Sequence, residues 1–156
     1  DIIAQIAACR KGEKELKRLI ERYGYETVKT YMYFIQDNAE YSVKVALWKL
    51  LNSKSKIENK FEDYLDDGTL LKVNVIIEAG SAPPDTVKAV FDFTGTAAQH
   101  YFDNLNTPLS VTKSAVLYVL RSIINTDIPL NSGCLRPIKI IAPKGSLLNP
   151  IYPVPV

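Results

Sequence analysis

Residues 71–78 read LKVNVIIE, and residues 87–93 read VKAVFDF. In both stretches apolar residues alternate with polar ones, which is the pattern of a strand with one buried and one solvated face. The connection between them, residues 79–85, contains a glycine and two prolines and is therefore predicted to be a loop. The two stretches predict neighbouring antiparallel strands in which Asp92 points away from the apolar face.

Two long helical patterns precede these strands. Residues 2–23 carry apolar side chains at helical spacing, with a bend or break expected near Gly12. Gly24 ends this helix, and a second helix is predicted from about residue 26 to residue 51. The second helix has an apolar stripe in steps of three and four residues: Val28, Met32, Ile35, Ala39, Val43, Ala46 and Leu50. We expect the two helices to form a long antiparallel hairpin that packs against something further, such as a partner subunit.

The polar face of the first helix is basic. It carries Arg10, Lys11, Lys14, Lys17, Arg18 and Arg22. Two interpretations stay open: a solvated face, or a contact with an acidic neighbouring domain.

The segment between the helices and the strands is polar. Residues 52–60 predict a loop. Five acids lie between Glu58 and Asp67, but they lack the alternating positions and the late glutamate of a calcium loop. The sequence Asp66-Asp67-Gly68 is instead typical of a hairpin turn.

A third helix is predicted to begin at Thr107 and Pro108, with a hydroxyl side chain at the N-cap and proline at the first helical position. Its predicted buried stripe is Val111, Ala115, Tyr118, Val119 and Ile123. A connecting loop over residues 125–132 and a short strand over residues 138–142 complete the pattern. The sequence thus predicts an α+β fold: a helical hairpin over residues 1–52, then a small, mainly antiparallel sheet, one further helix and polar loops over residues 53–156.

Composition excludes several classes of protein. The 156 residues suit one compact domain, and the net charge of +2 without a basic block argues against a nucleic-acid reader. No apolar run reaches the roughly 20 residues of a membrane span. Cys9 and Cys134 are far apart and join no Cys/His cluster, so we expect reduced thiols and a cytoplasmic location.

The ends of the chain suggest an excised piece of a longer protein. The chain starts at Asp1 without an initiator methionine, and residues 151–156 neither cap a helix nor close a strand. A mature processed protein is the alternative.

Few residues could carry chemistry unaided. His100 is the only histidine, which rules out a metal site built from several imidazoles of this chain. The spacing of Asp92, His100 and Ser114 does not support a catalytic triad, so we expect His100 in an exposed loop. Cys134 could be a structural thiol or a nucleophile. Arg136 could bind a carboxylate or phosphate, or pin its loop to backbone carbonyls.

Four segments rich in glycine, asparagine and proline interrupt the second half of the chain: residues 92–96 (DFTGT), 104–108 (NLNTP), 127–138 (DIPLNSGCLRPI) and 143–150 (PKGSLLNP). In this order they resemble the hydantoinase B/oxoprolinase family. Residues 1–8, 19–24, 37–40 and 62–68 also fit that family, so the resemblance covers nearly the whole chain.

The resemblance implies an activity. The family includes the B half of N-methylhydantoinase, the corresponding half of 5-oxoprolinase and large subunits of ketone carboxylases. It implies an ATP-dependent hydrolase that opens a cyclic amide or imide, in which a kinase-like A half activates the carbonyl and the B half resolves the activated species with water. A ketone carboxylase subunit and a non-catalytic scaffold for assembly with the A half are the alternatives.

The resemblance also implies cofactors and partners. ATP with Mg²⁺, and a further divalent metal, would act in the parent assembly, and none is expected in this fragment. The partners would be a hydantoinase A-like subunit or domain, a small cyclic amide and further copies in an oligomer, with no nucleic acid and no membrane.

The site residues follow from the matched loops. Asp92 is expected to orient water or substrate, and the substrate-binding candidates are Thr94, Gly95, Thr96, Asn104, Asn106, Asn131 and Arg136, with no metal ligand. We expect these loops to meet at a shared pocket wall. The sequence departs from the family at Asp103, where glycine is usual, and at Thr107, where alanine is usual. The family's histidine-rich motif is absent from this chain.

Overall fold

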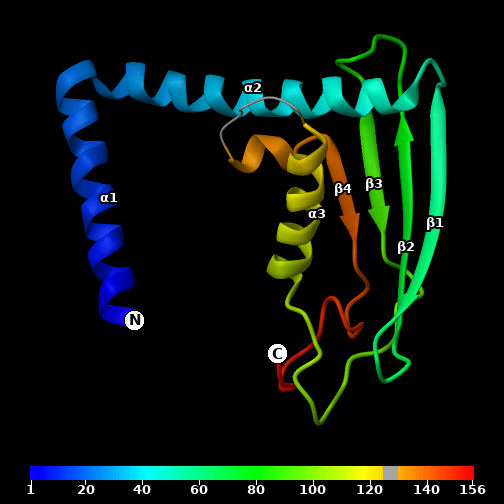
Figure 1. The fold of residues 1–156 in the computed structure, drawn as a ribbon. Coiled ribbons are helices and arrows are strands. Elements are labelled where there is room, and N and C mark those ends of the chain that lie inside the picture. Colours follow the sequence, from blue (N-terminus) through cyan, green and yellow to red (C-terminus); the bar gives the residue numbers. More distant parts are fainter. Residues whose placement is uncertain (125–129) are drawn as a thin grey trace.

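The computed structural model describes residues 1–124 and 130–156. The elements follow in the order α1 (Ile2–Tyr23), α2 (Tyr25–Leu51), β1 (Lys56–Tyr64), β2 (Leu70–Glu78), β3 (Lys88–Asp92), α3 (Leu109–Ile123), the 3₁₀ helix η1 (Ser132–Leu135) and β4 (Ile138–Ile141). Over these residues the strands form one sheet in the order β1-β2-β3-β4, antiparallel except for the β3–β4 pair (Figure 1). The predicted α+β class and mainly antiparallel sheet are confirmed. Of the loop predicted over residues 125–132, residues 125–129 lie outside the described residues.

The two N-terminal helices form an open elbow. Gly24, with φ +82°, is the single residue between them, whereas an antiparallel helical hairpin needs a loop of about 2 to 5 residues to reverse the chain. Figure 1 accordingly shows α1 turning away from α2, so the predicted hairpin packing is wrong. α1 has no buried residue, and it continues through Gly12 without the predicted break. An apolar groove of about 590 Å³ lies in the elbow.

The second half of α2 supplies the centre of the core. Ala39, Val43, Leu47 and Leu51 are buried at intervals of four residues, and they pack with residues of β2, β3, α3 and η1. Of the predicted stripe only Ala39 and Val43 are buried, whereas Met32 is 50% and Ile35 44% exposed. Beyond Val43 the buried stripe passes through Leu47 and Leu51, while Leu50 is 43% exposed.

The sheet has one face toward the core. Val75 pairs with Phe91 and Ile77 with Ala89, and all four side chains pack in or against the core cluster. This confirms the predicted antiparallel strand pair. β1 contradicts the loop predicted over residues 52–60, because its full-length pairing with β2 makes a strand of a sequence that is almost wholly exposed.

α3 begins one residue later than predicted. Its N-cap is Pro108, which makes no side-chain capping bond, and the Thr107 N–H instead donates to the Leu147 carbonyl at 2.7 Å. The buried residues of α3 are Thr112, Val116 and Leu120. The predicted stripe is wrong because α3 carries apolar residues on several faces, and packing against α2 and the sheet selects one of them. None of the described helices has the length and apolarity required to cross a membrane.

Truncating the two leucines tests which stripe of α2 is structural. Leu47→Ala should lower the free energy of unfolding by about 3 kcal/mol, since it leaves a cavity in the core. Leu50→Ala, three positions away on the same helix, should cost about 0.5 kcal/mol. Denaturant unfolding followed by circular dichroism measures both, and equal losses would contradict this packing.

Candidate functional site

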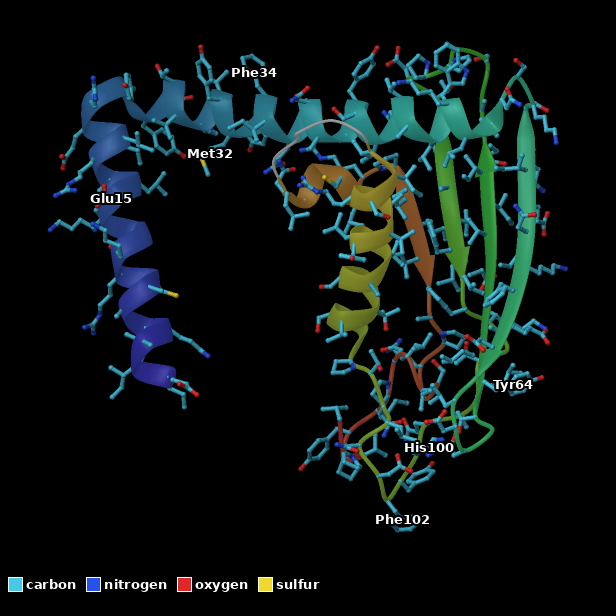
Figure 2. The ribbon with its side chains drawn as sticks, in the orientation of Figure 1. Glu15, Met32, Phe34, Tyr64, His100 and Phe102 are labelled. Atoms are coloured by element: carbon cyan, nitrogen blue, oxygen red, sulfur yellow. The ribbon has the colours of Figure 1, made fainter. Side chains whose placement is uncertain are left out.

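Three loops meet at the end of the sheet remote from α2 (Figure 2). They are the β1–β2 turn, the segment between β3 and α3, and the segment after β4. Backbone bonds tie them together: the Ala97 N–H donates to the Leu70 carbonyl, and the Leu147 N–H donates to the Ala97 carbonyl, both at 2.9 Å. This loop layer contains most of the predicted site residues.

Asp92 ends β3 at the edge of the loop layer. Its Oδ1 accepts a hydrogen bond of 2.9 Å from the Thr94 N–H. The Thr94 side chain and N–H lower the pKa of Asp92 below its ordinary value. Because Phe91 and Phe93 pack against the core, strand alternation places Asp92 on the opposite, open face. The site therefore contains a carboxylate that stays ionised at neutral pH and can accept hydrogen bonds.

Asn74 lies directly opposite Asp92 in the β2–β3 pairing, and sequence reasoning missed it. Its Nδ2 donates to Glu58 Oε1 at 3.0 Å. Its Oδ1 is buried and has no hydrogen-bond partner in the described part of the chain. Directly paired residues of a sheet share a face, so Asn74 and Asp92 lie on the same face of the sheet, where the Asn74 oxygen is covered by its neighbours. The only sequence signal for Asn74 was a polar residue inside an apolar strand.

Two residues of the DFTGT segment hold the loop against β2. Thr96 Oγ1 accepts from the Lys72 N–H at 3.1 Å and donates to the Lys72 carbonyl at 3.0 Å. Gly95 has φ +97°, and a Cβ there would lie 2.9 Å from Lys72 Cδ. Both residues thus shape the turn that positions Asp92.

The two predicted asparagines of the NLN segment differ. Asn106 is 4% exposed. Its Oδ1 accepts from the His100 N–H at 2.8 Å, and its Nδ2 donates to the carbonyls of His100 at 2.8 Å and Pro155 at 2.7 Å. Asn104 is exposed, and its side chain makes no hydrogen bond with the described residues. Asn106 is therefore a structural pin, and Asn104 is the asparagine available to a ligand.

His100 is not the exposed loop residue that we predicted, since its side chain is only 22% exposed. Its Nδ1 lies 2.7 Å from Asp103 Oδ2, and its Nε2 lies 3.0 Å from Thr69 Oγ1. Thr69 Oγ1 also lies 2.8 Å from Asp67 Oδ2. The hydroxyl donates its one proton to Asp67, so the side chains of Asp67, Thr69, His100 and Asp103 form one connected chain of polar contacts. The sequence feature that could have indicated this cluster is Asp103, which stands where the family usually has glycine.

Asn131 and Arg136 lie at the other end of the molecule, against α2. Asn131 Oδ1 accepts from the Gly133 N–H at 2.8 Å, and its Nδ2 donates to the Ile35 carbonyl at 3.3 Å. Arg136 pairs with Asp37 at 2.6 Å, and it bonds Gln36 and Glu40 as well. The expectation of one shared wall is therefore wrong for these two residues. Cys134, between them, is fully buried.

An open groove lies on the other face of the sheet. It occupies about 400 Å³ between the sheet and α3, and its lining is largely apolar, including Phe61, Leu71, Val73, Phe93 and Val111. No predicted site residue lines it. Asp92 and Asn74 thus belong to the open sheet face, away from this groove.

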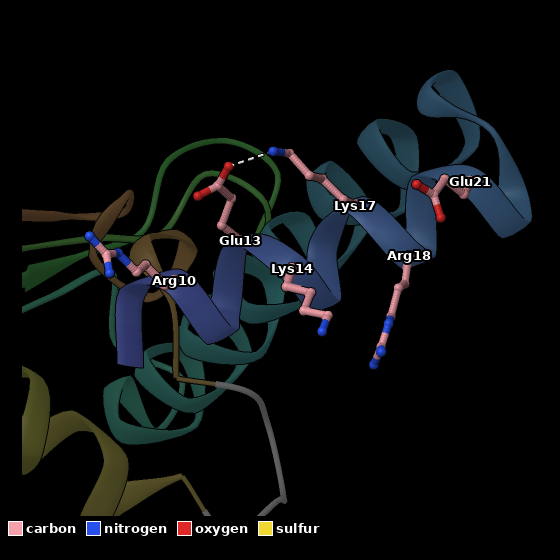
Figure 3. Close-up of a pocket in the computed structure, with 6 residues that line it drawn as sticks. All are labelled: Arg10, Glu13, Lys14, Lys17, Arg18 and Glu21. Atoms are coloured by element: carbon pink, nitrogen blue, oxygen red, sulfur yellow. Dashed lines mark hydrogen bonds and ion pairs between the residues drawn. The ribbon is translucent and has the colours of Figure 1, made fainter. Parts of the chain in front are cut away.

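The basic face of α1 is exposed among the described residues. Figure 3 shows its charged side chains standing on the outside of the helix, with Lys17 paired to Glu13 at 2.5 Å. The pairing lowers the pKa of Glu13 and raises that of Lys17. Among residues 1–124 and 130–156, no group of three His, Cys, Asp or Glu side chains is placed to hold a metal ion.

The structure defines an α+β chain that carries a polar loop layer at one end of its sheet. The chain belongs to the hydantoinase B/oxoprolinase family, whose family model matches residues 1–156. It is 43% identical to 5-oxoprolinase 1 of Arabidopsis thaliana over 96% of the chain and 12% of that protein. It is also 43% identical to 5-oxoprolinase of Saccharomyces cerevisiae, over 96% of the chain and 11% of that protein. The putative B component of a D-/L-hydantoinase from Pseudomonas sp. is 36% identical over 99% of the chain and 27% of that protein. The chain thus spans only a small part of these relatives.

The two asparagines of the NLN segment give a matched test of the loop layer. Asn106→Ala should lower the free energy of unfolding by about 2 to 3 kcal/mol, because it leaves buried backbone groups without partners. Asn104→Ala should change it by less than about 0.5 kcal/mol. Chemical denaturation of the two variants checks this, and a tolerated Asn106→Ala would show that the amide does not hold the loops.

Two glycines test the contact between η1 and α2. A Cβ at Gly133 would lie 2.0 Å from the Gln36 carbonyl oxygen, whereas nothing lies within 4 Å of a Cβ at Gly12. We expect Gly133→Ala to destabilise the fold by about 2 to 3 kcal/mol through overpacking. Gly12→Ala should stabilise it by about 0.5 to 1 kcal/mol, because alanine is the better helix former. Thermal unfolding measures the stability of both variants. A Gly133→Ala variant as stable as the wild type would contradict the close approach of η1 to α2.

Proposed function

We propose that this chain is part of an ATP-dependent hydrolase that opens a cyclic amide or imide of the 5-oxoproline or hydantoin type. The observation that carries the proposal is the 43% identity to two 5-oxoprolinases over 96% of the chain. The likeness to the B component of a hydantoinase supports placing the chain in the B half. In this proposal the B half acts on a substrate that a hydantoinase A-like subunit or domain has activated.

The proposed chemistry sets what the B half must supply. An amide carbon is a poor electrophile, and phosphorylating its oxygen turns that oxygen into a leaving group. Water then attacks the carbon, and the ring C–N bond breaks as the nitrogen takes up a proton, which leaves an acyl phosphate. A second water hydrolyses the acyl phosphate to carboxylate and phosphate. The B half must therefore position the attacking water and stabilise the charge that develops.

Asp92 is our first candidate for positioning water or substrate. Its lowered pKa makes it an acceptor and not a proton donor at neutral pH. Asn74 lies beside Asp92 on the same sheet face, but its Oδ1 is buried, so Asp92 is the acceptor assigned to the ligand. A water molecule or the ring N–H of a cyclic amide supplies the donor that the Asp92 carboxylate would bind.

The other predicted residues have unequal parts in the proposal. Thr94, Gly95, Thr96 and Asn106 shape the loops around Asp92, and the exposed amide of Asn104 is free to contact substrate. Asn131 and Arg136 are weaker candidates, because their side chains already bind α2. In the proposal both act on substrate only if that contact is broken.

The described residues do not fit a nucleotide or a metal ion. They contain no cluster of three metal-ligating side chains, and the sequence has no phosphate-binding glycine loop. We therefore assign ATP, Mg²⁺ and a further divalent metal to the rest of the parent assembly and derive no step through them. We also place the protein in the cytoplasm, where its two cysteines would stay reduced; within the described residues neither of them forms a disulfide.

The assay that tests the function uses the full-length parent with its A-like partner. We expect ATP-dependent ring opening of 5-oxoproline or a hydantoin, measured as phosphate and ring-opened product. Turnover of an acetophenone-like ketone with bicarbonate, and none with cyclic amides, would show that the parent is a carboxylase and not a hydrolase. The absence of any turnover would favour the scaffold.

The role of Asp92 is tested in the same assembly. Asp92→Asn should lower kcat about 100-fold, because the amide is a weaker acceptor toward the attacking water. Asp85→Asn removes an exposed carboxylate at the opposite end of the sheet and should leave kcat unchanged. Full activity of Asp92→Asn would remove Asp92 from the site.

A further inference from the structure

We propose that the free edge of β1 pairs with the β1 edge of a second copy of this chain. The two strands would run antiparallel about a two-fold axis through Asn59. The sheet of one copy would then continue into the sheet of the other.

The outer edge of β1 is available for pairing. β1 is the first strand of the sheet order, and β2 is its only strand neighbour among the described residues. The Ala79 N–H donates to the Ser55 carbonyl and the Leu65 N–H to the Thr69 carbonyl, so the odd-numbered residues of β1 bond β2. In an antiparallel ladder the intervening residues direct their N–H and C=O groups the other way. The even-numbered residues from Lys56 to Glu62 therefore present unpaired backbone groups at the edge.

In one register, each charged side chain of β1 from Lys56 to Glu62 lies opposite an unlike charge of the second copy. With Asn59 on the axis, Lys56 lies opposite Glu62 of the second copy, and Glu58 lies opposite Lys60 of the second copy. All these residues are even-numbered and share one face of the sheet, and all are exposed. Directly opposed unlike charges stabilise a strand pair, whereas like charges destabilise it. Each charged side chain between Lys56 and Glu62 thus meets its opposite.

The odd-numbered face also fits. Ile57 packs against the core, while Phe61 is 64% exposed. In the proposed register Phe61 lies opposite Ile57 of the second copy. The exposed ring would then gain an apolar cross-strand neighbour, and the core-side face would continue across the dimer.

Neighbouring registers are worse. Centring the axis on Glu58 or on Lys60 places that residue against its own charge in the second copy. Centring it on Phe61 leaves only the pairing of Lys60 with Glu62. Charges on an edge strand ordinarily discourage pairing with other chains, but in this alternating order the register centred on Asn59 forms more unlike pairs than its neighbours.

A cysteine trap tests the register in the purified protein. Asn59 bonds β2, so across the new interface the two Asn59 residues form the non-hydrogen-bonded pair, with Cα atoms about 4.5 Å apart, within disulfide reach. In a Cys9→Ser background, which removes the exposed thiol, Asn59→Cys should give a covalent dimer under mild oxidation. Phe61→Cys should give none. A dimer with Phe61→Cys alone, or with neither variant, overturns the proposal.

A charge swap gives an independent test without cysteine. Lys60→Glu opposes two pairs of acids across the axis and should raise the dimer dissociation constant about tenfold. Adding Glu58→Lys restores unlike pairs and should recover the affinity, while Lys29→Glu on α2 should have no effect. Analytical ultracentrifugation measures each constant. A monomeric wild type, an unaffected Lys60→Glu, or a double variant without recovery overturns the proposal. A monomer is also the result expected if another segment of the same polypeptide covers this edge.

Discussion

The packing of the second half of α2 against one end of the sheet is the contact on which the rest of the structure depends. Leu47 and Leu51 are almost completely buried, and the cluster they join reaches β2, β3, α3 and η1. η1 approaches so closely that only glycine fits at position 133, and Arg136 adds ion pairs to the same helix. Because this contact fixes which face of the sheet is buried, it also fixes that Asp92 and Asn74 lie on the face left open.

Some polar side chains of the loop layer hold the loops in place, and others remain available to a ligand. Thr96, Asn106 and Asn131 all use their side chains on backbone groups, as expected of polar residues in loops that must be held in one geometry. The groups left over are fewer: the Asp92 carboxylate and the Asn104 side chain. A sequence motif indicates all of these residues alike. Their hydrogen-bond partners in the structure are needed to tell the residues that hold the loops from those that can contact a ligand.

Local periodicity predicted the parts of the fold that local forces determine. β2 and β3 have clear alternation, and the helical period of α2 predicted the helix together with two of its buried residues, Ala39 and Val43. β1 could not be found in this way, since its KIENKFEDY sequence is exposed on nearly every residue and pairing with β2 alone makes it a strand. The elbow at Gly24 depends on the length of the linker between α1 and α2, and the apolar stripe of a helix does not indicate how that helix packs against its neighbour. The half-buried state of His100 depends on contacts with Thr69 and Asp103. Thr69 is distant in sequence, and the sequence did not indicate which residue Asp103, an aspartate where the family usually has glycine, would contact.

The proposed dimer edge and the proposed site meet at Glu58. Its carboxylate accepts the Asn74 Nδ2 donor at 3.0 Å, and this bond, with that from Lys56, lowers the pKa of Glu58, so it remains a charged acceptor at neutral pH. This bond holds the amide of Asn74, the residue that lies opposite Asp92 in the sheet. A lysine of a second copy opposite Glu58 would share the same carboxylate. Occupation of the β1 edge would then weaken the bond to Asn74 and loosen the amide that stands beside Asp92, so assembly and site geometry are joined through a single side chain.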